Sequence, residues 1–155
     1  MALKIGDKCP LFTLPDQHGN PFNIGDLLGK KLLVIYFYPK DDTPGCTKEA
    51  CYFRDSYEDF KELGCEVIGI SSDDQDSHKK FAEQYKLPFV LLSDHKSRVR
   101  KVFGVPANLF GLIPGRVTYI IDRNGIIRGV HNSLLDPKGH LEMAKTTVHQ
   151  LLQIS

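Results

Sequence analysis

One apolar stretch, residues 32–38, constrains the possible fold of this chain more than any other feature of the sequence. It reads LLVIYFY, is rich in β-branched and aromatic residues, and ends at Pro39. An uninterrupted apolar run of this length is typical of a strand that is buried on both faces of a sheet. We therefore expect a layered fold in which a central sheet is covered on both sides.

Helix and strand patterns alternate along the rest of the chain. After Cys46, apolar residues recur at spacings of three and four, which predicts a helix that stops at Gly64. Further helices are predicted at 78–86, 95–104 and 137–152. Further strands are predicted at 66–71, 89–92, 117–122 and 126–131. This alternation is typical of the α/β class.

Two turn signals complete the expected topology. Asn124-Gly125 predicts a hairpin between the last two strands, so the central sheet is mixed. Residues 16–21, which read DQHGNP, predict a turn between two short extended pieces and hence an N-terminal extension hairpin. With 155 residues and no linker or repeat, the chain is expected to form a single domain over residues 1–155.

Composition and charge restrict the class of protein. Lys and Arg total 20 against 19 Asp and Glu, which gives no electrostatic reason to expect nucleic acid or a membrane surface as partner. No apolar run approaches the roughly 18 residues of a membrane span. The first residues carry charges and a proline, unlike a signal peptide. We therefore expect a cytoplasmic protein or, alternatively, the mature form of an organellar protein whose targeting peptide has been removed.

Cys46 lies where the predicted strand, a loop reading KDDTPG and the predicted helix meet. The first turn of a helix presents unpaired N–H groups and a partial positive charge, which both stabilise a thiolate. A rigid strand behind the loop fixes the direction of the sulfur. Cys46 is therefore a candidate nucleophile, and the alternative is an inert, buried cysteine.

Residues 36–51, which read YFYPKDDTPGCTKEAC, resemble the active-site segment of the peroxiredoxins. Pro39, Thr43 and Cys46 match the family pattern P-x-x-x-T-x-x-C. A second cysteine, Cys51, follows five residues later, as in the subgroup called peroxiredoxin Q or bacterioferritin comigratory protein. The resemblance covers nearly the whole chain, and it implies a thioredoxin-like fold and a thiol peroxidase that needs no metal, flavin or haem.

The resemblance also implies roles for individual residues. Cys46 is the peroxidatic nucleophile, whose thiolate attacks one peroxide oxygen and becomes a sulfenic acid. Thr43 offers a hydroxyl to the peroxide, and Arg116, in the motif Arg116-x-Thr118, supplies a permanent positive charge. Pro39 closes the pocket against water.

Two supporting positions follow from the same resemblance. Backbone N–H groups near Gly45 are expected to bind the peroxide oxygens as the O–O bond stretches. Glu49 matches a family acid that holds the catalytic arginine in place. An acid in the first helical turn is favourable in any case, so Glu49 has a second, purely structural explanation.

The spacing of the two cysteines has a mechanical consequence. On an ideal helix, positions 46 and 51 lie about 140° apart and their Cα atoms about 8.6 Å apart. A disulfide needs Cα atoms within roughly 7 Å, so the helix must unwind before the two can bond. We expect Cys51 to resolve the Cys46 sulfenic acid after such unwinding, and thioredoxin or a similar dithiol to reduce the disulfide.

The remaining candidates have plainer explanations. Cys9 and Cys65 are expected to be small, partly buried side chains, and a disulfide between them is unsupported. The cysteines lack the spacing of a zinc site, and the histidines show no i,i+4 pair, so no metal is expected. The acidic run at 71–76 suggests a cation site, but a loop that caps the next helix is the favoured interpretation.

Three questions stay open at this level. A redox sensor that passes a disulfide to a partner is the main competitor of a peroxidase, whereas a holdase has no support because no large exposed apolar segment is evident. Resolution within one chain requires no dimer, so a monomer is expected. Apolar residues in the loop at 105–115 either favour bulky hydroperoxides or pack the core: Leu109, Phe110, Leu112 and Ile113.

Overall fold

The computed structural model describes residues 2–108 and 113–154, and its centre is a five-stranded sheet in the order β5-β4-β3-β8-β9. The strands are β3 (Leu32–Phe37), β4 (Cys65–Ser71), β5 (Val90–Ser93), β8 (Val117–Ile121) and β9 (Ile127–Asn132). β3 is parallel to β4 and antiparallel to β8, so the expected mixed sheet is confirmed. Every residue of β3 is buried, as the apolar run at 32–38 predicts.

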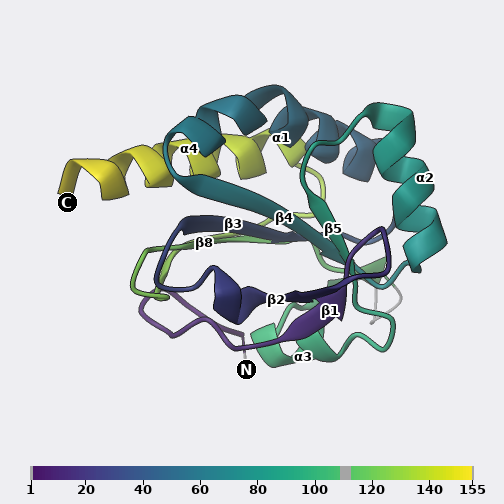
Figure 1. The fold of residues 1–155 in the computed structure, drawn as a ribbon, viewed down its shortest axis with the longest axis horizontal. Helices are drawn as coiled ribbons and strands as arrows, with labels where there is room; N and C mark the ends of the chain where they lie inside the picture. The colour runs from purple at the N-terminus through teal and green to yellow at the C-terminus, as the bar shows by residue number, and fades with distance from the viewer. Residues whose placement is uncertain (1, 109–112, 155) are drawn as a thin grey trace.

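Helices cover this sheet as the layered prediction requires. The helices are α1 (Pro44–Glu62), α2 (Gln75–Tyr85), α3 (Arg98–Phe103) and α4 (Pro137–Ile154). α1 and α4 lie side by side on one face, and α2 flanks the edge at β5 (Figure 1). The opposite face carries α3 and the predicted N-terminal hairpin, formed by β1 (Thr13–Pro15) and β2 (Pro21–Asn23), with the short helix η1 (Ile24–Asp26) after it.

The two faces of β3 supply two separate halves of the core. Val34 and Tyr36 pack toward the α1 and α4 side, together with Phe53 and Ala144. Leu33, Ile35 and Phe37 pack toward α3 with Phe103. This alternation follows from the two-residue period of a strand. It fixes the end of β3 rigidly beneath the loop that leads to Cys46.

The helix starts differ from the sequence prediction, and local caps explain why. α1 begins at Pro44 rather than Cys46, because a proline is favourable in the first helical turn. α2 begins at Gln75 rather than residue 78, because the Asp74 carboxylate accepts a hydrogen bond from the Ser77 N–H. α3 is shorter than predicted, because Ser97 adopts a left-handed conformation with φ of 56°. The acidic run at 71–76 therefore does contain a helix cap.

Two further strands, β6 (Ala107–Asn108) and β7 (Ile113–Pro114), pair within the loop expected at 105–115. Of the four apolar residues proposed there, Ile113 is half-buried, while Leu109, Phe110 and Leu112 lie outside the described residues. Among residues 2–108 and 113–154, no helix has both the length and the apolar character that a membrane crossing requires.

Candidate active site

The loop between β3 and α1 places Cys46 in the first turn of α1. Thr43 is the N-cap residue in an extended conformation, and its hydroxyl donates a hydrogen bond to the Lys40 carbonyl at 2.9 Å. Cys46 is only 1% exposed. The described structure therefore holds the Cys46 sulfur at a helix N-terminus, against the core side of α1.

Arg116 reaches the same sulfur from the neighbouring strand. It directly precedes β8, and the pairing of Phe37 with Val117 brings the end of β3 beside the start of β8. Its Nη2 donates to the Cys46 Sγ at 3.3 Å, and its Nε donates to the Leu134 carbonyl at 3.0 Å. Arg116 is 3% exposed, so this positive charge acts on the sulfur with little screening by water.

Glu49 completes the group from one turn further along α1. Its Oε1 accepts from Arg116 Nη1 at 2.7 Å, and the side chain is fully buried. Burial raises the pKa of Glu49 to about 7, against the opposing effect of the Arg116 charge. The sequence prediction thus names three residues, Cys46, Glu49 and Arg116, that the structure joins by hydrogen bonds.

The other predicted residues lie around this group without a hydrogen bond to the sulfur. Gly45 packs against the guanidinium, since a Cβ there would lie 3.0 Å from Arg116 Nη2. Pro39 is half-buried two residues after the end of β3. Cys51 is half-buried on α1, and both it and Cys46 are free thiols within one continuous helix. The helical geometry that keeps the two sulfurs apart is therefore present.

A buried histidine that the sequence did not single out lies behind Glu49. His140 Nδ1 is 3.6 Å from Glu49 Oε2, an oxygen that has no hydrogen-bond partner among the described residues. Burial lowers the pKa of His140 to about 4, so the ring is neutral. Its Nε2 donates to the Ser133 carbonyl at 2.7 Å, which leaves Nδ1 to accept from the Thr118 hydroxyl at 2.8 Å.

Arg100 is a second missed residue, and it joins the two segments that carry Cys46 and Arg116. Its Nη2 donates to the Tyr38 carbonyl at 2.9 Å, and its Nη1 donates to the Gly115 carbonyl at 2.8 Å. The side chain is 7% exposed, and burial lowers its pKa. The fork of the guanidinium thereby fixes the spacing between the end of β3 and the residue before Arg116.

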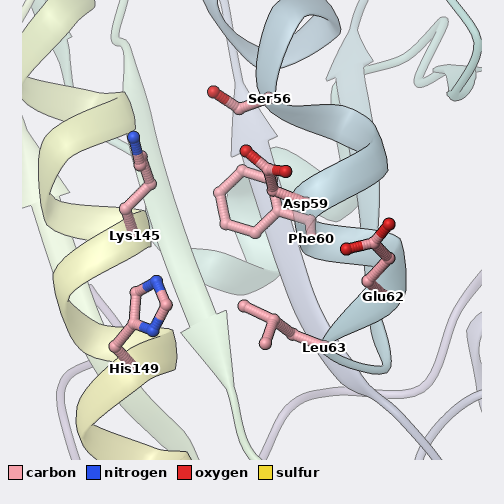
Figure 2. Close-up of a pocket in the computed structure, with 7 residues that line it drawn as sticks. All are labelled: Ser56, Asp59, Phe60, Glu62, Leu63, Lys145 and His149. Carbon is pink, nitrogen blue, oxygen red and sulfur yellow. The ribbon is translucent and has the colours of Figure 1, made fainter.

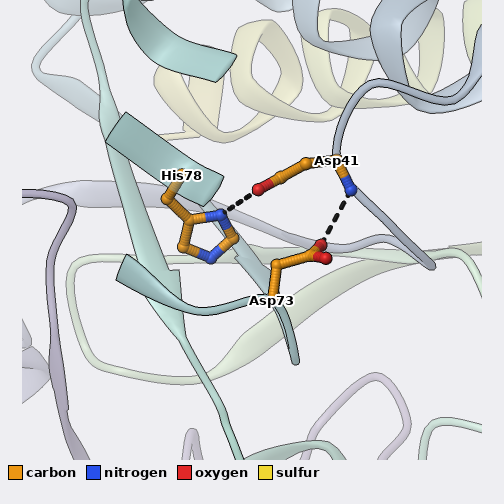
Figure 3. A group of neighbouring side chains, drawn as sticks. All are labelled: Asp41, Asp73 and His78. Carbon is orange, nitrogen blue, oxygen red and sulfur yellow. Dashed lines mark hydrogen bonds and ion pairs between the residues drawn. The ribbon is translucent and has the colours of Figure 1, made fainter. Parts of the chain in front are cut away.

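A third missed group, Asp41, Asp73 and His78, lies between the Cys46 loop and α2 (Figure 3). These side chains offer atoms within 4.8 Å of one another, the spacing of a possible metal site. Protein donors already fill that space: Asp73 Oδ2 accepts from the Asp41 N–H at 2.7 Å and from the Ser71 hydroxyl at 2.7 Å. The three residues therefore form a hydrogen-bond network.

The two remaining cysteines differ from Cys46 in their surroundings. Cys9 and Cys65 are buried free thiols in the two separate halves of the core. Burial raises the pKa of each thiol to about 12, which keeps both protonated at neutral pH. Their expected role as small buried side chains fits these surroundings.

A pocket between the C-terminal half of α1 and α4 lies away from this group (Figure 2). Phe60 and Leu63 form its floor on the α1 side, and Lys145 and His149 face them from α4. None of the predicted site residues lines it.

The chain is similar to proteins of one known family. Residues 5–130 match the AhpC/TSA family. Peroxiredoxin Q, chloroplastic, from Sedum lineare is 55% identical over 137 residues, which cover 88% of this chain and 73% of that protein. The protein of the same name from Arabidopsis thaliana is also 55% identical over 137 residues, which cover 88% of this chain but 63% of that protein.

Two solved structures align along almost the entire chain. Peroxidoxin BcpB from Mycobacterium tuberculosis has a TM-score of 0.89 and 38% identity, and the alignment covers 96% of this chain and 98% of that one. A cysteine-to-serine mutant of PrxQ from Xylella fastidiosa has a TM-score of 0.83 and 26% identity, with 94% of this chain and 98% of that one covered.

The comparisons correct the expected location. The relatives from Sedum lineare, Suaeda salsa and Arabidopsis thaliana are all named chloroplastic. The expectation of a cytoplasmic protein is therefore wrong. The alternative expectation, an organellar protein, is the one that these names support.

Proposed function

Because the chain belongs to the AhpC/TSA family and is a peroxiredoxin of the Q type, we propose that it reduces peroxides through a sulfenic acid on Cys46. Its thioredoxin-like fold and its class, an oxidoreductase with thiol peroxidase activity, are those of its relatives. One observation supports the choice of residue above the others. Arg116 donates to the Cys46 sulfur at 3.3 Å while Glu49 holds the other end of the guanidinium.

The proposed chemistry begins with the Cys46 thiolate. The sulfur attacks one peroxide oxygen, the O–O bond breaks, and the other oxygen leaves as alkoxide or hydroxide, which takes up a proton. Sulfur is oxidised to sulfenic acid and the peroxide is reduced to alcohol or water. The Arg116 charge stabilises both the thiolate and the negative charge that develops on the leaving oxygen.

The loop residues are proposed to bind the peroxide. The Thr43 hydroxyl, which now donates to the Lys40 carbonyl, has lone pairs free to accept a hydrogen bond from the peroxide. The N–H groups of Gly45 and Cys46 belong to the first helical turn, where no intrahelical acceptor exists for them. Pro39 covers the loop at the end of β3 and limits the access of water.

Cys51 is proposed to complete the cycle by attacking the Cys46 sulfenic acid. A Cys46–Cys51 disulfide and one water form, with no external oxidant. Since both cysteines lie within the continuous helix α1, the turns between them must first unwind. Equal hydrogen-exchange protection of the amides at 47–54 in the dithiol and disulfide forms would contradict this step.

The disulfide requires a thiol reductant, and we propose thioredoxin or a similar dithiol, acting in a plastid as for the chloroplastic relatives. Because Cys51 lies in the same chain as Cys46, the proposal needs no second subunit. We expect a monomer, and a light-scattering mass well above 17.5 kDa would contradict that expectation.

Peptide mapping after one equivalent of hydrogen peroxide, followed by reduced thioredoxin, tests the proposal. We expect a Cys46–Cys51 bridge that forms within the dead time of manual mixing and is then removed by thioredoxin. In the matched variant Cys51→Ser, the Cys46 sulfenic acid should accumulate instead. A bridge that thioredoxin leaves intact would favour the redox-sensor alternative, and peroxide consumption without any bridge would disprove the role of Cys51.

A further inference from the structure

Helix α2 contacts the chain on both sides of the segment that must unwind. Before the segment, His78 Nδ1 lies 2.6 Å from Asp41 Oδ2, and the Tyr85 hydroxyl donates to Asp42 Oδ1 at 2.9 Å. After it, Arg54 Nη1 donates to the Tyr85 carbonyl at 2.8 Å. The turns that carry Cys46 and Cys51 thus lie between two sets of contacts with the same helix.

The contact between Asp41 and His78 is the strongest of these by its surroundings. His78 is fully buried and Asp41 is 7% exposed, so no water competes for their bond. His78 Nε2 lies 3.0 Å from the Leu92 carbonyl, which can only accept, so the ring is held at both nitrogens. By contrast, the bond between Tyr85 and Asp42 is exposed to solvent, and exposed hydrogen bonds contribute less.

Further donors converge on Asp41 and fix its carboxylate. The Tyr38 hydroxyl donates to Oδ1 at 2.5 Å, and the Ser77 hydroxyl donates to Oδ2 at 2.8 Å. The Asp41 backbone N–H donates to Asp73, as Figure 3 shows. The end of β3, the loop before Thr43 and the start of α2 are therefore joined through this single carboxylate.

The backbone next to Asp41 is strained. Asp42 has a φ of 58°, a left-handed conformation that few residues other than glycine adopt. Such a conformation persists only where the surrounding contacts hold it. Loss of the contacts to α2 would allow the loop to relax and the first turn of α1 to unwind.

We propose that Asp41 and His78 are positioning residues that hold the start of α1 in its folded form and so set the fate of the Cys46 sulfenic acid. The inference rests on the proposed function. In the folded form, the sulfenic acid can react with a second peroxide to give sulfinic acid and one alcohol or water. In the unwound form, it condenses with the Cys51 thiol to give the disulfide and water. A stronger contact between Asp41 and His78 therefore increases the fraction of Cys46 that is oxidised to sulfinic acid.

Two substitutions of His78 separate its two hydrogen bonds. The amide of His78→Asn reaches the position of Nδ1 and keeps a donor toward Asp41. The longer His78→Gln reaches the position of Nε2, so it keeps the bond to the Leu92 carbonyl and loses the bond to Asp41. Tyr85→Phe is a milder third variant, because it removes only the solvent-exposed hydroxyl that binds Asp42.

The measurement is the ratio of sulfinic acid to disulfide at Cys46, by mass spectrometry, over a series of peroxide concentrations. We expect His78→Gln to lower the sulfinic share by about fivefold, as the loss of one buried hydrogen bond implies, and to slow the first oxidation of Cys46. His78→Asn should stay close to the parent, and Tyr85→Phe should shift the ratio in the same direction by less.

Asn23→Ala is the control for a merely structural effect. It removes the side chain that caps η1, which among the described residues has no hydrogen bond to α2 or to the Cys46 loop, so it should lower Tm but leave the ratio unchanged. A parental ratio in both His78→Gln and Tyr85→Phe overturns the inference, as does an equal shift in Asn23→Ala. Absence of any Cys46–Cys51 bridge in the parent protein instead disproves the proposed function itself.

Discussion

Cys46 and Cys65 are equally buried, each with 1% of its surface exposed, yet their surroundings differ completely. The Cys46 sulfur lies in the first turn of α1 and receives an N–H bond from Arg116. The Cys65 sulfur lies in β4, and its contact is with the Glu66 carbonyl at 3.8 Å, while burial raises its pKa to about 12. Since the two thiols are equally buried, the proposal that Cys46 reacts, whereas Cys65 does not, depends on the charged donor beside the Cys46 sulfur.

The largest expected effect comes from removing one sulfur at a time. Cys46→Ser should abolish peroxide consumption, because the serine hydroxyl is not a nucleophile at neutral pH. Cys65→Ala should keep nearly full activity, since the Cys65 side chain only fills space in the core. Peroxide consumption with a dithiol reductant measures both. Equal losses in the two variants would contradict the contrast between these cysteines.

The next largest effect should come from the charged donor. Arg116→Met should lower the second-order rate of Cys46 oxidation by about 100-fold, the typical cost of one preorganised donor to developing charge. The oxidation rate of Arg116→Lys should fall between those of the parent and Arg116→Met. The lysine ammonium keeps the positive charge but cannot reach the sulfur, Glu49 and the Leu134 carbonyl together. The control is Arg128→Met, which removes the pair between the exposed Arg128 and the buried Asp122. A rate unaltered in Arg116→Met would remove the basis of the proposal.

A smaller effect concerns the pH dependence of stability. Burial raises the pKa of Glu49 to about 7 from 4.5, so the folded protein binds this proton more tightly than the unfolded chain. The contribution of this proton to the free energy of unfolding is complete below about pH 4.5 and is lost as the pH rises through about 7. Relative to Glu49→Gln, the parent should therefore lose about 2 kcal/mol of unfolding free energy between about pH 5 and about pH 7.5.

That comparison is best made by urea denaturation with Cys46→Ser in both proteins, so that oxidation of Cys46 does not interfere. His140 changes the free energy of unfolding in the opposite direction. Its pKa is lowered to about 4, so the stability that its neutral ring contributes is lost as the pH falls below 6.5. Subtraction of the Glu49→Gln curve removes the part of the His140 effect that is common to both proteins. Parallel curves for the two proteins would show that Glu49 is ionised throughout this range.

The smallest expected effect is the extent to which Cys9 and Cys65 react with an alkylating reagent. Since burial raises the pKa of Cys9 and Cys65 to about 12, native protein at about pH 8 should be alkylated at Cys46 and Cys51 only. Mass mapping after brief iodoacetamide treatment measures this. Rapid modification of Cys65 would show that burial does not protect it.

Sequence patterns predicted the fold well where one physical effect dominates. The apolar run at 32–38 predicts β3 to within one residue, and the apolar periodicity predicts α1 and α4. Helix starts were predicted less well, because single caps such as Asp74 and the left-handed Ser97 decide them. The pairing of β6 with β7 spans too few residues to leave a periodic signal.

The candidate site was predictable only in part. Its loop carries a recognisable motif, and Arg116 was identified through the same resemblance. Arg100, His78 and His140 were missed because their partners lie far away in sequence: the Tyr38 carbonyl, the Asp41 carboxylate and the Thr118 hydroxyl. A buried arginine or histidine leaves no local pattern, since its partners are brought together by the strand order alone.

One labelling experiment tests the central contrast most directly. The Cys51→Ser variant is treated with one equivalent of hydrogen peroxide in the presence of dimedone, which traps sulfenic acids, and the labelled peptides are mapped. We expect the label on Cys46 alone, with Cys9 and Cys65 unmodified. Label on Cys65 at a level comparable to Cys46 would contradict the claim that the Arg116 donor, rather than burial, selects the reactive sulfur.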